Sequence, residues 1–178
     1  MQAREARMKI TAQEEYGLRC LLRFARAGRE QALTIPEVAE AERLSVPYVG
    51  KLLAILRQGG LIESTRGRGG GYRLAAAPAD VGVGSVLLVL GEPLFDDPDY
   101  CRRHAGTESD GRCVHRDGCS LRGLWQALEH WMRRVLDRIT LADLLRDEGR
   151  VPELLRSRLA DVLAEAPPLI HLTTRGED

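Results

Sequence analysis

The stretch SVPYVGKLLAILRQGGLIESTRGRGGGYRL, residues 45–74, decides the fold. Its first half predicts a helix, because Ser45 is a favourable N-cap, a proline follows in the first turn, and apolar residues recur at helical spacing until Gly59 and Gly60. Its second half contains two strand-like runs, LIEST and GYRL, on either side of a glycine-rich turn that carries two arginines. This pattern predicts a β-hairpin with a basic tip.

The residues before this stretch predict two more helices. One spans 11–27, where Thr11 and Glu14 have the spacing of a capping box, and the other spans 34–44. Two helices, a turn, a third helix and a hairpin follow one another in the order of a winged helix-turn-helix. We therefore expect residues 8–78 to form a winged helix-turn-helix domain.

The chain after the hairpin changes character twice. A connecting helix is predicted at 79–91, with Asp80 as its candidate N-cap. Residues 92–119 are rich in Gly, Pro, Asp, Arg, His and Cys and show no periodicity, which predicts a cysteine-rich loop. A long dimerisation helix is predicted at 120–147, and a C-terminal tail with one more helix at 148–178.

The helix predicted at 120–147 carries an apolar seam that resembles a coiled-coil seam and is too apolar to stand alone. Thr140, with Asp143 three residues later, predicts that the helix restarts at this point. The fold class is therefore mainly α with a small β-hairpin, a winged helix-turn-helix domain followed by a long dimerisation helix. The predicted seam consists of Leu121, Leu124, Trp125, Leu128, Trp131, Met132, Val135 and Ile139.

The charge of the chain is unevenly distributed, although the net charge is zero. Residues 1–78 hold 13 Lys+Arg against 8 Asp+Glu, a balance of +5, whereas residues 79–178 hold 13 against 18, a balance of −5. A basic winged domain suits double-stranded DNA, with its second motif helix in the major groove and arginines of the wing in a narrow minor groove. The candidate DNA-binding residues are Ser45, Pro47, Tyr48 and Lys51 in the helix, and Arg66, Arg68, Gly69 and Tyr72 in the hairpin.

Composition and motifs exclude several classes of protein. The chain is 44% hydrophobic and contains no run of eighteen apolar residues, so it can bury a core but is not expected to span a membrane. Its first residues, MQAREARMKI, lack the apolar stretch of a secretory signal, which predicts a cytoplasmic location. No phosphate loop, HExxH, Gly-x-Ser-x-Gly or dinucleotide fingerprint is present, so we do not expect an enzyme.

Three of the four cysteines lie close together, at Cys101, Cys113 and Cys119. In the cytoplasm such thiols more often bind a metal or undergo redox chemistry than form structural disulfides. Iron–sulfur clusters need thiolates and usually four ligands, and these residues supply three. Cys119 is predicted to begin the long helix, whose first amides would help hold a negatively charged sulfur.

Other uses of these thiols remain open. His104 and His115 are alternative fourth ligands, or could complete a zinc site, although C-x11-C-x5-C lacks the tight cysteine pair typical of structural zinc. The cysteines could also undergo regulated oxidation without binding any metal. Cys20 lies on the apolar face of its predicted helix and is interpreted as a small buried hydrophobe.

Three segments, 8–22, 45–74 and CSLRGLW at 119–125, together resemble the IscR/NsrR/RirA-type family of bacterial winged-helix regulators. The resemblance implies a homodimer held by the long helix, which binds palindromic promoter DNA and carries an iron–sulfur cluster that controls DNA affinity. It also implies that Gly50 replaces an acidic residue that helps to choose the DNA sequence, so the operator is expected to differ. The DNA contacts that it implies are Ser45, Tyr48 and Arg66.

The resemblance also suggests a fourth ligand. The IscR branch has a histidine three residues after the last cysteine, where this chain has Arg122. The NsrR branch instead uses an aspartate from the first helix of the partner, and Glu15 occupies the matching position. The implied ligand set is therefore Cys101, Cys113, Cys119 and Glu15 of the partner subunit. A 4Fe–4S cluster is favoured by analogy with that branch, and a 2Fe–2S cluster is the second choice.

Overall fold

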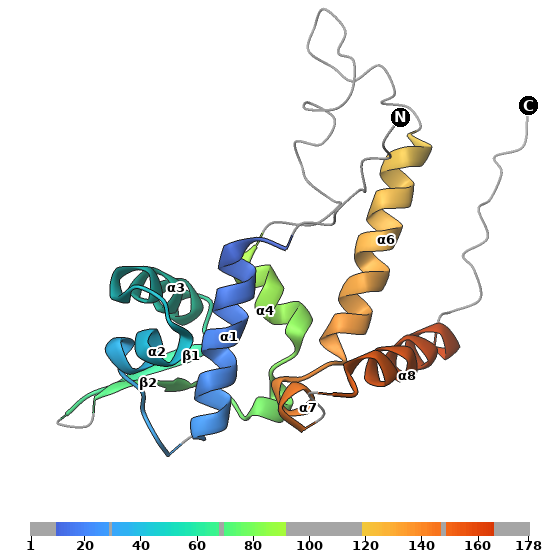
Figure 1. Ribbon diagram of the computed structural model, residues 1–178. Coiled ribbons are helices and arrows are strands. Elements are labelled where there is room, and N and C mark those ends of the chain that lie inside the picture. Colours follow the sequence, from blue (N-terminus) through green and yellow to red (C-terminus); the bar gives the residue numbers. More distant parts are fainter. Residues whose placement is uncertain (1–9, 29, 68–69, 92–118, 147–148, 166–178) are drawn as a thin grey trace, which may run out of the picture.

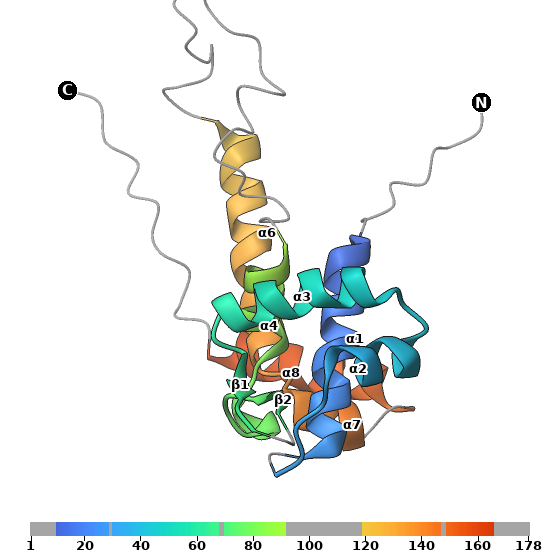
Figure 2. The same ribbon diagram turned by 90° about the vertical axis from the view of Figure 1, so that its left-hand side faces the viewer.

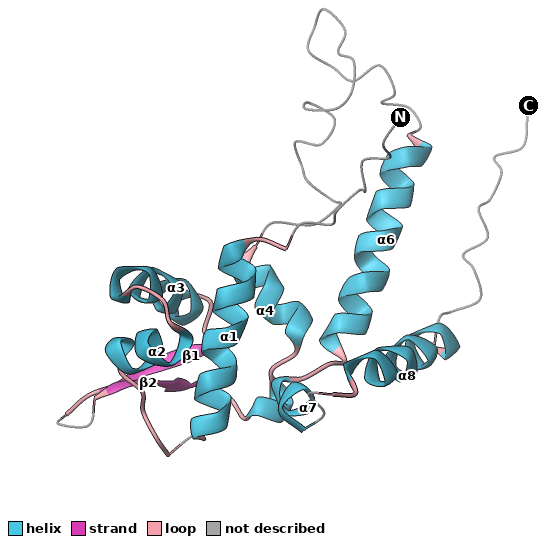
Figure 3. Ribbon diagram, viewed as in Figure 1, coloured by secondary structure: helices cyan, strands magenta, loops and turns pink. Residues whose placement is uncertain are grey.

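The computed structural model describes residues 10–28, 30–67, 70–91, 119–146 and 149–165. In these residues the chain forms helices and one two-stranded antiparallel sheet (Figure 3). The predicted fold class, mainly α with a small hairpin, is confirmed. Within the described part of the chain, no helix is both long enough and apolar enough to cross a membrane.

Three helices begin where the sequence predicts. They are α1 (Ala12–Ala27), α2 (Ile35–Glu42) and α3 (Val46–Gln58). Helix α2 ends two residues earlier than predicted, because the backbone of Arg43 turns into the left-handed region at φ 56°. In each case a hydroxyl side chain accepts a hydrogen bond from a backbone amide of the first turn, and these predicted N-caps are Thr11, Thr34 and Ser45.

The apolar faces of these helices pack into a single core with the hairpin and the helix that follows it. On α1, Cys20, Leu21 and Phe24 are buried while Tyr16 is half-buried, and on α3 the whole apolar stripe is buried. This shared burial stabilises the short helices together. Truncation of a fully buried leucine to alanine in such a core costs about 2–5 kcal/mol. The largest fully buried side chains include Leu21, Phe24, Leu52, Leu53, Leu56, Ile62, Leu74 and Leu90.

The hairpin consists of β1 (Ile62–Thr65) and β2 (Gly71–Leu74), as predicted. The strands are antiparallel, and residue 62 pairs with 74 at the inner end while 65 pairs with 71 at the outer end. Glu63 and Arg73 are directly opposite each other, and the Arg73 Nε atom lies 2.8 Å from a Glu63 carboxylate oxygen. This cross-strand ion pair supports the register of the wing.

A third backbone segment, which the sequence did not predict, joins the hairpin. The amide of Leu33 donates to the carbonyl of Tyr72 at 2.9 Å, and the amide of Tyr72 donates back at 2.8 Å. Gly71 permits this approach, because a Cβ atom at that position would lie 2.6 Å from the carbonyl oxygen of Leu33. The wing is therefore attached directly to the residue that precedes the N-cap of α2.

The predicted connecting helix at 79–91 is wrong in its first part. A 3-10 turn occupies Pro78–Asp80, and helix α4 (Val83–Leu90) begins only after Gly82, which is its N-cap. Asp80 therefore does not cap this helix. The reason is a pairing with a distant part of the chain, which holds Val81 and Gly82 in an extended conformation.

This pairing is an isolated β-bridge between Gly82 and Thr140. The Val83 amide donates to the Ile139 carbonyl at 2.8 Å, and the amide of residue 141 donates to the carbonyl of residue 81 at 3.0 Å. Gly82 is therefore extended, and α4 begins only at the next residue. The bridge ties the end of the winged domain to the segment that follows the long helix.

The segment 120–147, expected as one dimerisation helix with a restart, forms two helices. Helix α6 (Ser120–Asp137) is followed by the bridge and then by the short helix α7 (Leu141–Arg146). The restart predicted at Thr140 is confirmed. Helix α8 (Val151–Ala164) is the further helix predicted in the C-terminal tail, and it packs against α6. In Figure 1 the wing, α2 and α3 lie at one end of the molecule, while α6 and α8 lie at the other.

Asp143 forms a buried capping box at the start of α7. Its Oδ2 atom accepts hydrogen bonds from the Thr140 amide at 3.0 Å and the Thr140 hydroxyl at 2.9 Å, and Arg146 lies 2.7 Å from Oδ1. Arg158 of α8 is 4.0 Å away. Burial opposes ionisation of Asp143, but the Thr140 hydrogen bonds and the two arginines outweigh it and lower its pKa.

Asp143→Asn is expected to reduce the free energy of unfolding by about 1–2 kcal/mol at pH 7. Because the folded pKa lies below the unfolded value of about 3.9, the contribution of the carboxylate is present above that value and lost as the pH falls further. The gap between variant and wild type should therefore shrink between about pH 4 and pH 2. Urea unfolding at several pH values measures it, with the exposed Asp80→Asn as the matched control.

Candidate nucleic-acid interface and cysteine site

The start of α3 presents the predicted DNA-contacting residues on one exposed surface. Ser45, Val46, Pro47 and Lys51 are exposed, while Tyr48 is half-buried. Figure 2 shows α3 lying across the face of the molecule that is turned toward the viewer, in front of α1. The structure therefore brings together four exposed side chains at the start of α3, where a major groove would meet the helix. One of them is the apolar Val46, which suits a thymine methyl.

Ser45 has two roles that are compatible with each other. Its Oγ atom accepts a hydrogen bond from the Tyr48 amide at 3.4 Å, which makes it the N-cap of α3. Its hydroxyl proton remains available to donate to a phosphate or a base. The unpaired amides and the dipole at this helix end also favour an anion, so the start of α3 suits the DNA backbone.

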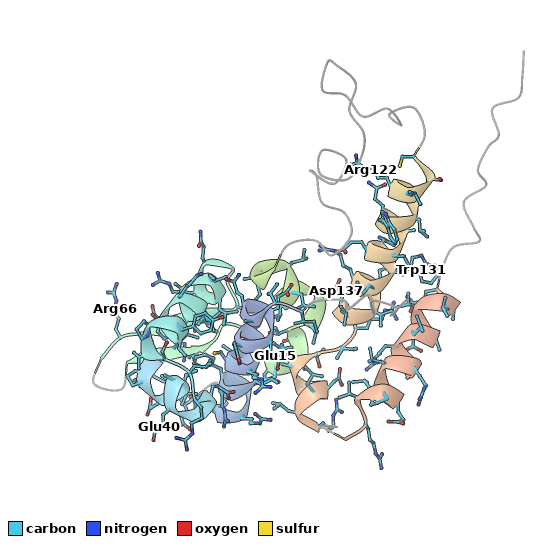
Figure 4. The ribbon with its side chains drawn as sticks, turned by 45° about the horizontal axis from the view of Figure 1, so that its top comes forward. Glu15, Glu40, Arg66, Arg122, Trp131 and Asp137 are labelled. Atoms are coloured by element: carbon cyan, nitrogen blue, oxygen red, sulfur yellow. The ribbon has the colours of Figure 1, made fainter. Side chains whose placement is uncertain are left out.

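The tip of the wing carries Arg66 into solvent. Figure 4 shows its side chain pointing away from the body of the molecule. Gly67 has φ 110°, and the amide of Gly70 donates to the Gly67 carbonyl at 2.9 Å, so this tight tip depends on glycine. The other predicted contacts at the tip, Arg68 and Gly69, lie outside the described residues.

Tyr72 is placed differently from the other candidates. Its side chain is half-buried and packs against the core, while its backbone is paired with Leu33. In the structure Tyr72 positions the wing. Its predicted contact with DNA is tested by nothing in this arrangement and stays a prediction.

Gly50 lies on α3, one residue before Lys51. A Cβ atom at this position would lie 3.9 Å from the Cδ1 atom of Ile35, which is an ordinary contact. Packing therefore does not require glycine here. A larger residue would fit at position 50 of α3. Because the residue is glycine, there is open space beside the exposed side chains of this helix.

Cys119 is the N-cap of α6. Its Sγ atom accepts a hydrogen bond from the Arg122 amide at 3.4 Å, and the residue is half-exposed. A sulfur atom at a helix N-terminus suits a thiolate ligand, since the helix dipole stabilises negative charge there. Among the described residues, no group of three or more His, Cys, Asp or Glu could hold a metal ion. The remaining candidates lie outside them, namely Cys101, Cys113, His104 and His115.

Cys20 belongs to the core, as predicted. Its side chain is completely buried in α1, and burial raises its pKa to about 12. The thiol therefore stays protonated at neutral pH and is unsuited to bind metal or react with oxidants. This leaves the three cysteines of 101–119 as the candidates for chemistry.

Glu15, the implied fourth ligand, is exposed on α1 and bonded to Arg19. The Arg19 Nε atom lies 2.7 Å from the Glu15 Oε1 atom, and 46% of the Glu15 side chain is exposed. In Figure 4 Glu15 lies on α1, whereas Arg122, three residues after Cys119, lies at the free end of α6. A single chain therefore does not bring Glu15 to Cys119.

A chain of contacts that the sequence did not predict leads from Glu15 to the recognition helix. The Arg19 guanidinium carbon lies 5.9 Å from the ring centroid of Tyr16. The Tyr16 ring in turn meets Tyr48 edge to face, with centroids 6.1 Å apart and an interplanar angle of 86°. The i, i+4 spacing of Glu15 and Arg19 predicts only the first contact, because the others depend on how α1 packs on α3.

The start of α1 also contacts the end of α4, immediately before residues 92–118. The Gln13 side-chain amide donates to the Leu90 carbonyl at 2.5 Å. The buried carboxylate of Glu14 lies so close to Gly91 that a Cβ atom there would be 2.0 Å from Glu14 Oε1. The same helix that carries Glu15 therefore fixes the residue from which the cysteine-rich segment departs.

These features define a winged helix-turn-helix protein with an exposed recognition helix and a thiol at the start of a long C-terminal helix. Residues 10–147 match the Rrf2 family, described as "Iron-dependent Transcriptional regulator". The chain belongs to this family. It is an Rrf2-family transcriptional regulator of the IscR and NsrR type.

Individual relatives cover most of the chain. It is 38% identical to the protein Rrf2 of Nitratidesulfovibrio vulgaris over 82% of this chain and 93% of that protein. It is also 38% identical to NsrR of Geobacillus kaustophilus, over 85% of this chain and 99% of that protein. The second of these relatives is named as a transcriptional regulator, as is the family, which agrees with the expectation that the chain is not an enzyme.

Solved structures of similar fold include two named regulators. IscR of T. potens has a TM-score of 0.58 and 32% identity, and the match covers 80% of this chain and 89% of that one. CymR, the global cysteine regulator of B. subtilis, has a TM-score of 0.56 and 29% identity, covering 76% and 95%. The winged-helix fold expected from the sequence is thereby confirmed.

Proposed function

We propose that the protein is a homodimeric regulator whose affinity for promoter DNA is controlled by an iron–sulfur cluster. Cys101, Cys113 and Cys119 would hold the cluster together with Glu15 of the partner subunit. When bound, the cluster supplies a centre whose integrity or oxidation state responds to redox conditions, nitric oxide or iron. A 4Fe–4S cluster is the favoured type and a 2Fe–2S cluster the second choice.

The observation that carries this proposal is the chain of contacts from Glu15 through Arg19 and Tyr16 to Tyr48. Here Glu15 holds Arg19, and Arg19 lies over the Tyr16 ring. A Glu15 carboxylate that serves as a ligand in the partner's site donates charge to the cluster, which weakens its bond with Arg19. Tyr16 then loses one restraint, and so does the Tyr48 ring that it contacts on α3.

The DNA-binding part of the proposal follows from the exposed surface of α3 and the wing. The start of α3 enters the major groove, where Lys51 neutralises a phosphate and Ser45 and Tyr48 contact phosphates or base edges. Arg66 reaches the adjacent minor groove. Two subunits related by a two-fold axis would read two half-sites of a palindrome.

An anaerobic absorbance spectrum with iron and sulfide counts tests the cluster, and Glu15→Ala tests its fourth ligand. Wild-type protein should be brown and should bleach with nitric oxide or oxygen, whereas Glu15→Ala should hold a less stable cluster with an altered spectrum. Glu40→Ala, an exposed glutamate of α2, is the matched control and should leave the spectrum unchanged. Colourless protein with stoichiometric zinc would overturn the cluster, and an unchanged Glu15→Ala spectrum would remove Glu15 from the site.

Arg66→Ala is expected to weaken promoter binding about tenfold, equivalent to about 1.4 kcal/mol, because a wing cation is lost. Arg156→Ala removes the same charge from an exposed position on α8 and should have no such effect. Fluorescence anisotropy at fixed salt measures both, with a duplex selected from a random pool. Equal affinities of the two variants would exclude the wing contact.

A second candidate function is regulation by thiol oxidation or zinc without a cluster. Two observations favour it, namely the half-exposed Cys119 thiol and the similarity to CymR, a cysteine regulator. Under this alternative, the protein is colourless as purified. Its DNA affinity then changes on treatment with peroxide or on removal of zinc, and recovers with a reducing agent or added zinc.

A further inference from the structure

An apolar groove of about 420 Å³ lies between α6 and α8. In Figure 1 the two helices meet at an angle near the C-terminal end of α6, and Figure 4 shows Trp131 on the part of α6 beside α8. No charged side chain is among the residues that line the groove, so water is a poor occupant. The lining residues are Leu128, Trp131, Met132, Val135, Leu136, Leu155 and Leu159.

The groove continues an apolar stripe along α6. Exposure along this stripe falls from 56% at Leu121 through 48% at Leu124 and 42% at Leu128 to 37% at Trp131 and 9% at Val135. The N-terminal half of α6 therefore carries exposed leucines, whereas its C-terminal half packs against α8 and forms the groove with it. The exposed leucines of the N-terminal half have the size and apolar character to fill a groove like the one beside the C-terminal half.

We infer that the groove receives Leu121 and Leu124 of the partner subunit, so that α8 is part of the dimer interface. This rests on the homodimer of the proposed function. Leu121 and Val135 lie seven residues on either side of Leu128, about 10.5 Å each way along the helix. If two α6 helices pair in antiparallel orientation with the two-fold axis at Leu128, the N-terminal half of each α6 lies on the C-terminal half of the other, beside that subunit's α8.

Helix α8 contributes a second wall to this interface. The match to the family ends at residue 147, before α8 begins. Val162 is buried, and the Arg138 Nη1 atom donates to Glu165 at 2.9 Å, so α8 is held on the rest of the chain. Leu155 and Leu159 nevertheless remain 38% and 43% exposed. Because α8 is already fixed and its two exposed leucines line the groove, a partner can bind there without the cost of ordering this helix.

Leu159→Glu and Leu155→Glu test the inference in the full-length protein. Sedimentation velocity over a concentration series should show a dimer dissociation constant at least about a hundredfold higher, because each dimer would bury two carboxylates in an apolar groove. Ser157→Glu, exposed on the opposite side of α8, is the matched control and should dimerise like the wild type. Circular dichroism checks the folding, and the double variant Leu155→Ala with Leu159→Ala replaces any variant that fails to fold.

The occupant is tested by charge pairing between subunits. A double variant that combines Leu159→Glu with Leu121→Lys or Leu124→Lys should dimerise more strongly than either single variant, since opposite charges then meet in the groove. If Leu159→Glu dimerises like the wild type while Leu128→Glu is monomeric, the role of α8 is overturned but the α6 interface is not. The same conclusion would follow if residues 166–178 of the same chain occupied the groove. Dimers in both variants would instead overturn the homodimer interface of the proposed function.

Discussion

Leu128→Glu is expected to produce a folded monomer that binds promoter DNA at least about a hundredfold more weakly than the wild type. Leu128 lies at the centre of the exposed stripe on α6 and is 42% exposed in the single chain. In the proposed dimer it meets its own copy across the two-fold axis. Two carboxylates would therefore be buried face to face in an apolar seam, which costs several kcal/mol. The monomer also loses the second half-site contact.

Sedimentation velocity and anisotropy on a selected palindromic duplex measure both effects on the same sample. His130→Glu is the matched control, because His130 is exposed on the other side of α6, two residues along the same helix. It should remain dimeric and bind DNA like the wild type. A dimeric Leu128→Glu with normal DNA affinity would show that the interface lies elsewhere.

Gly71→Val is expected to lower the free energy of unfolding by about 3 kcal/mol and to abolish the ordered wing. The new Cβ atom would lie 2.6 Å from the carbonyl oxygen of Leu33 and 3.3 Å from the amide nitrogen of Thr34. Both neighbours are backbone atoms, so neither can rotate away. Relief requires separation of Leu33 from Tyr72, which breaks the two hydrogen bonds that attach the wing to α2.

Gly149→Val is the comparison for this variant, because a Cβ atom at Gly149 meets nothing within 4 Å. Urea unfolding should show the large loss only for Gly71→Val, and DNA affinity should fall with it. Wild-type stability of Gly71→Val would mean that the wing separates from α2 at no cost. The bridge would then have no part in positioning Arg66.

The elements that could be predicted from the sequence are those whose signals are local. The N-caps Thr11, Thr34 and Ser45 each satisfy the amide three residues later, so a short window of sequence contains the whole interaction. The same is true of the hairpin, whose glycines and strand residues are adjacent. The start of α4 was mispredicted because Val83 bonds to Ile139, more than fifty residues later, and no local signal announces that partner.

The candidate site divides in the same way. The exposed start of α3 and the position of Cys119 before α6 follow from helix boundaries, which the sequence predicts. The contact between Tyr16 and Tyr48 depends on the packing of α1 against α3, and each tyrosine taken alone is an ordinary half-buried residue. Glu15 was implied by family resemblance, and its bond to Arg19 is the contact that a ligand role would weaken.

The contacts of Gln13 and Glu14 with the end of α4 have a consequence for exchange of sequence between relatives. Residue 91 is fixed by α1, and Cys119 is fixed as the first cap of α6. The two anchor points of the segment 92–118 are therefore set by the rest of the fold and not by the length of chain between them. We therefore expect that a relative's cysteine spacing can be grafted between residues 91 and 119 without changing the fold of α3 and the wing.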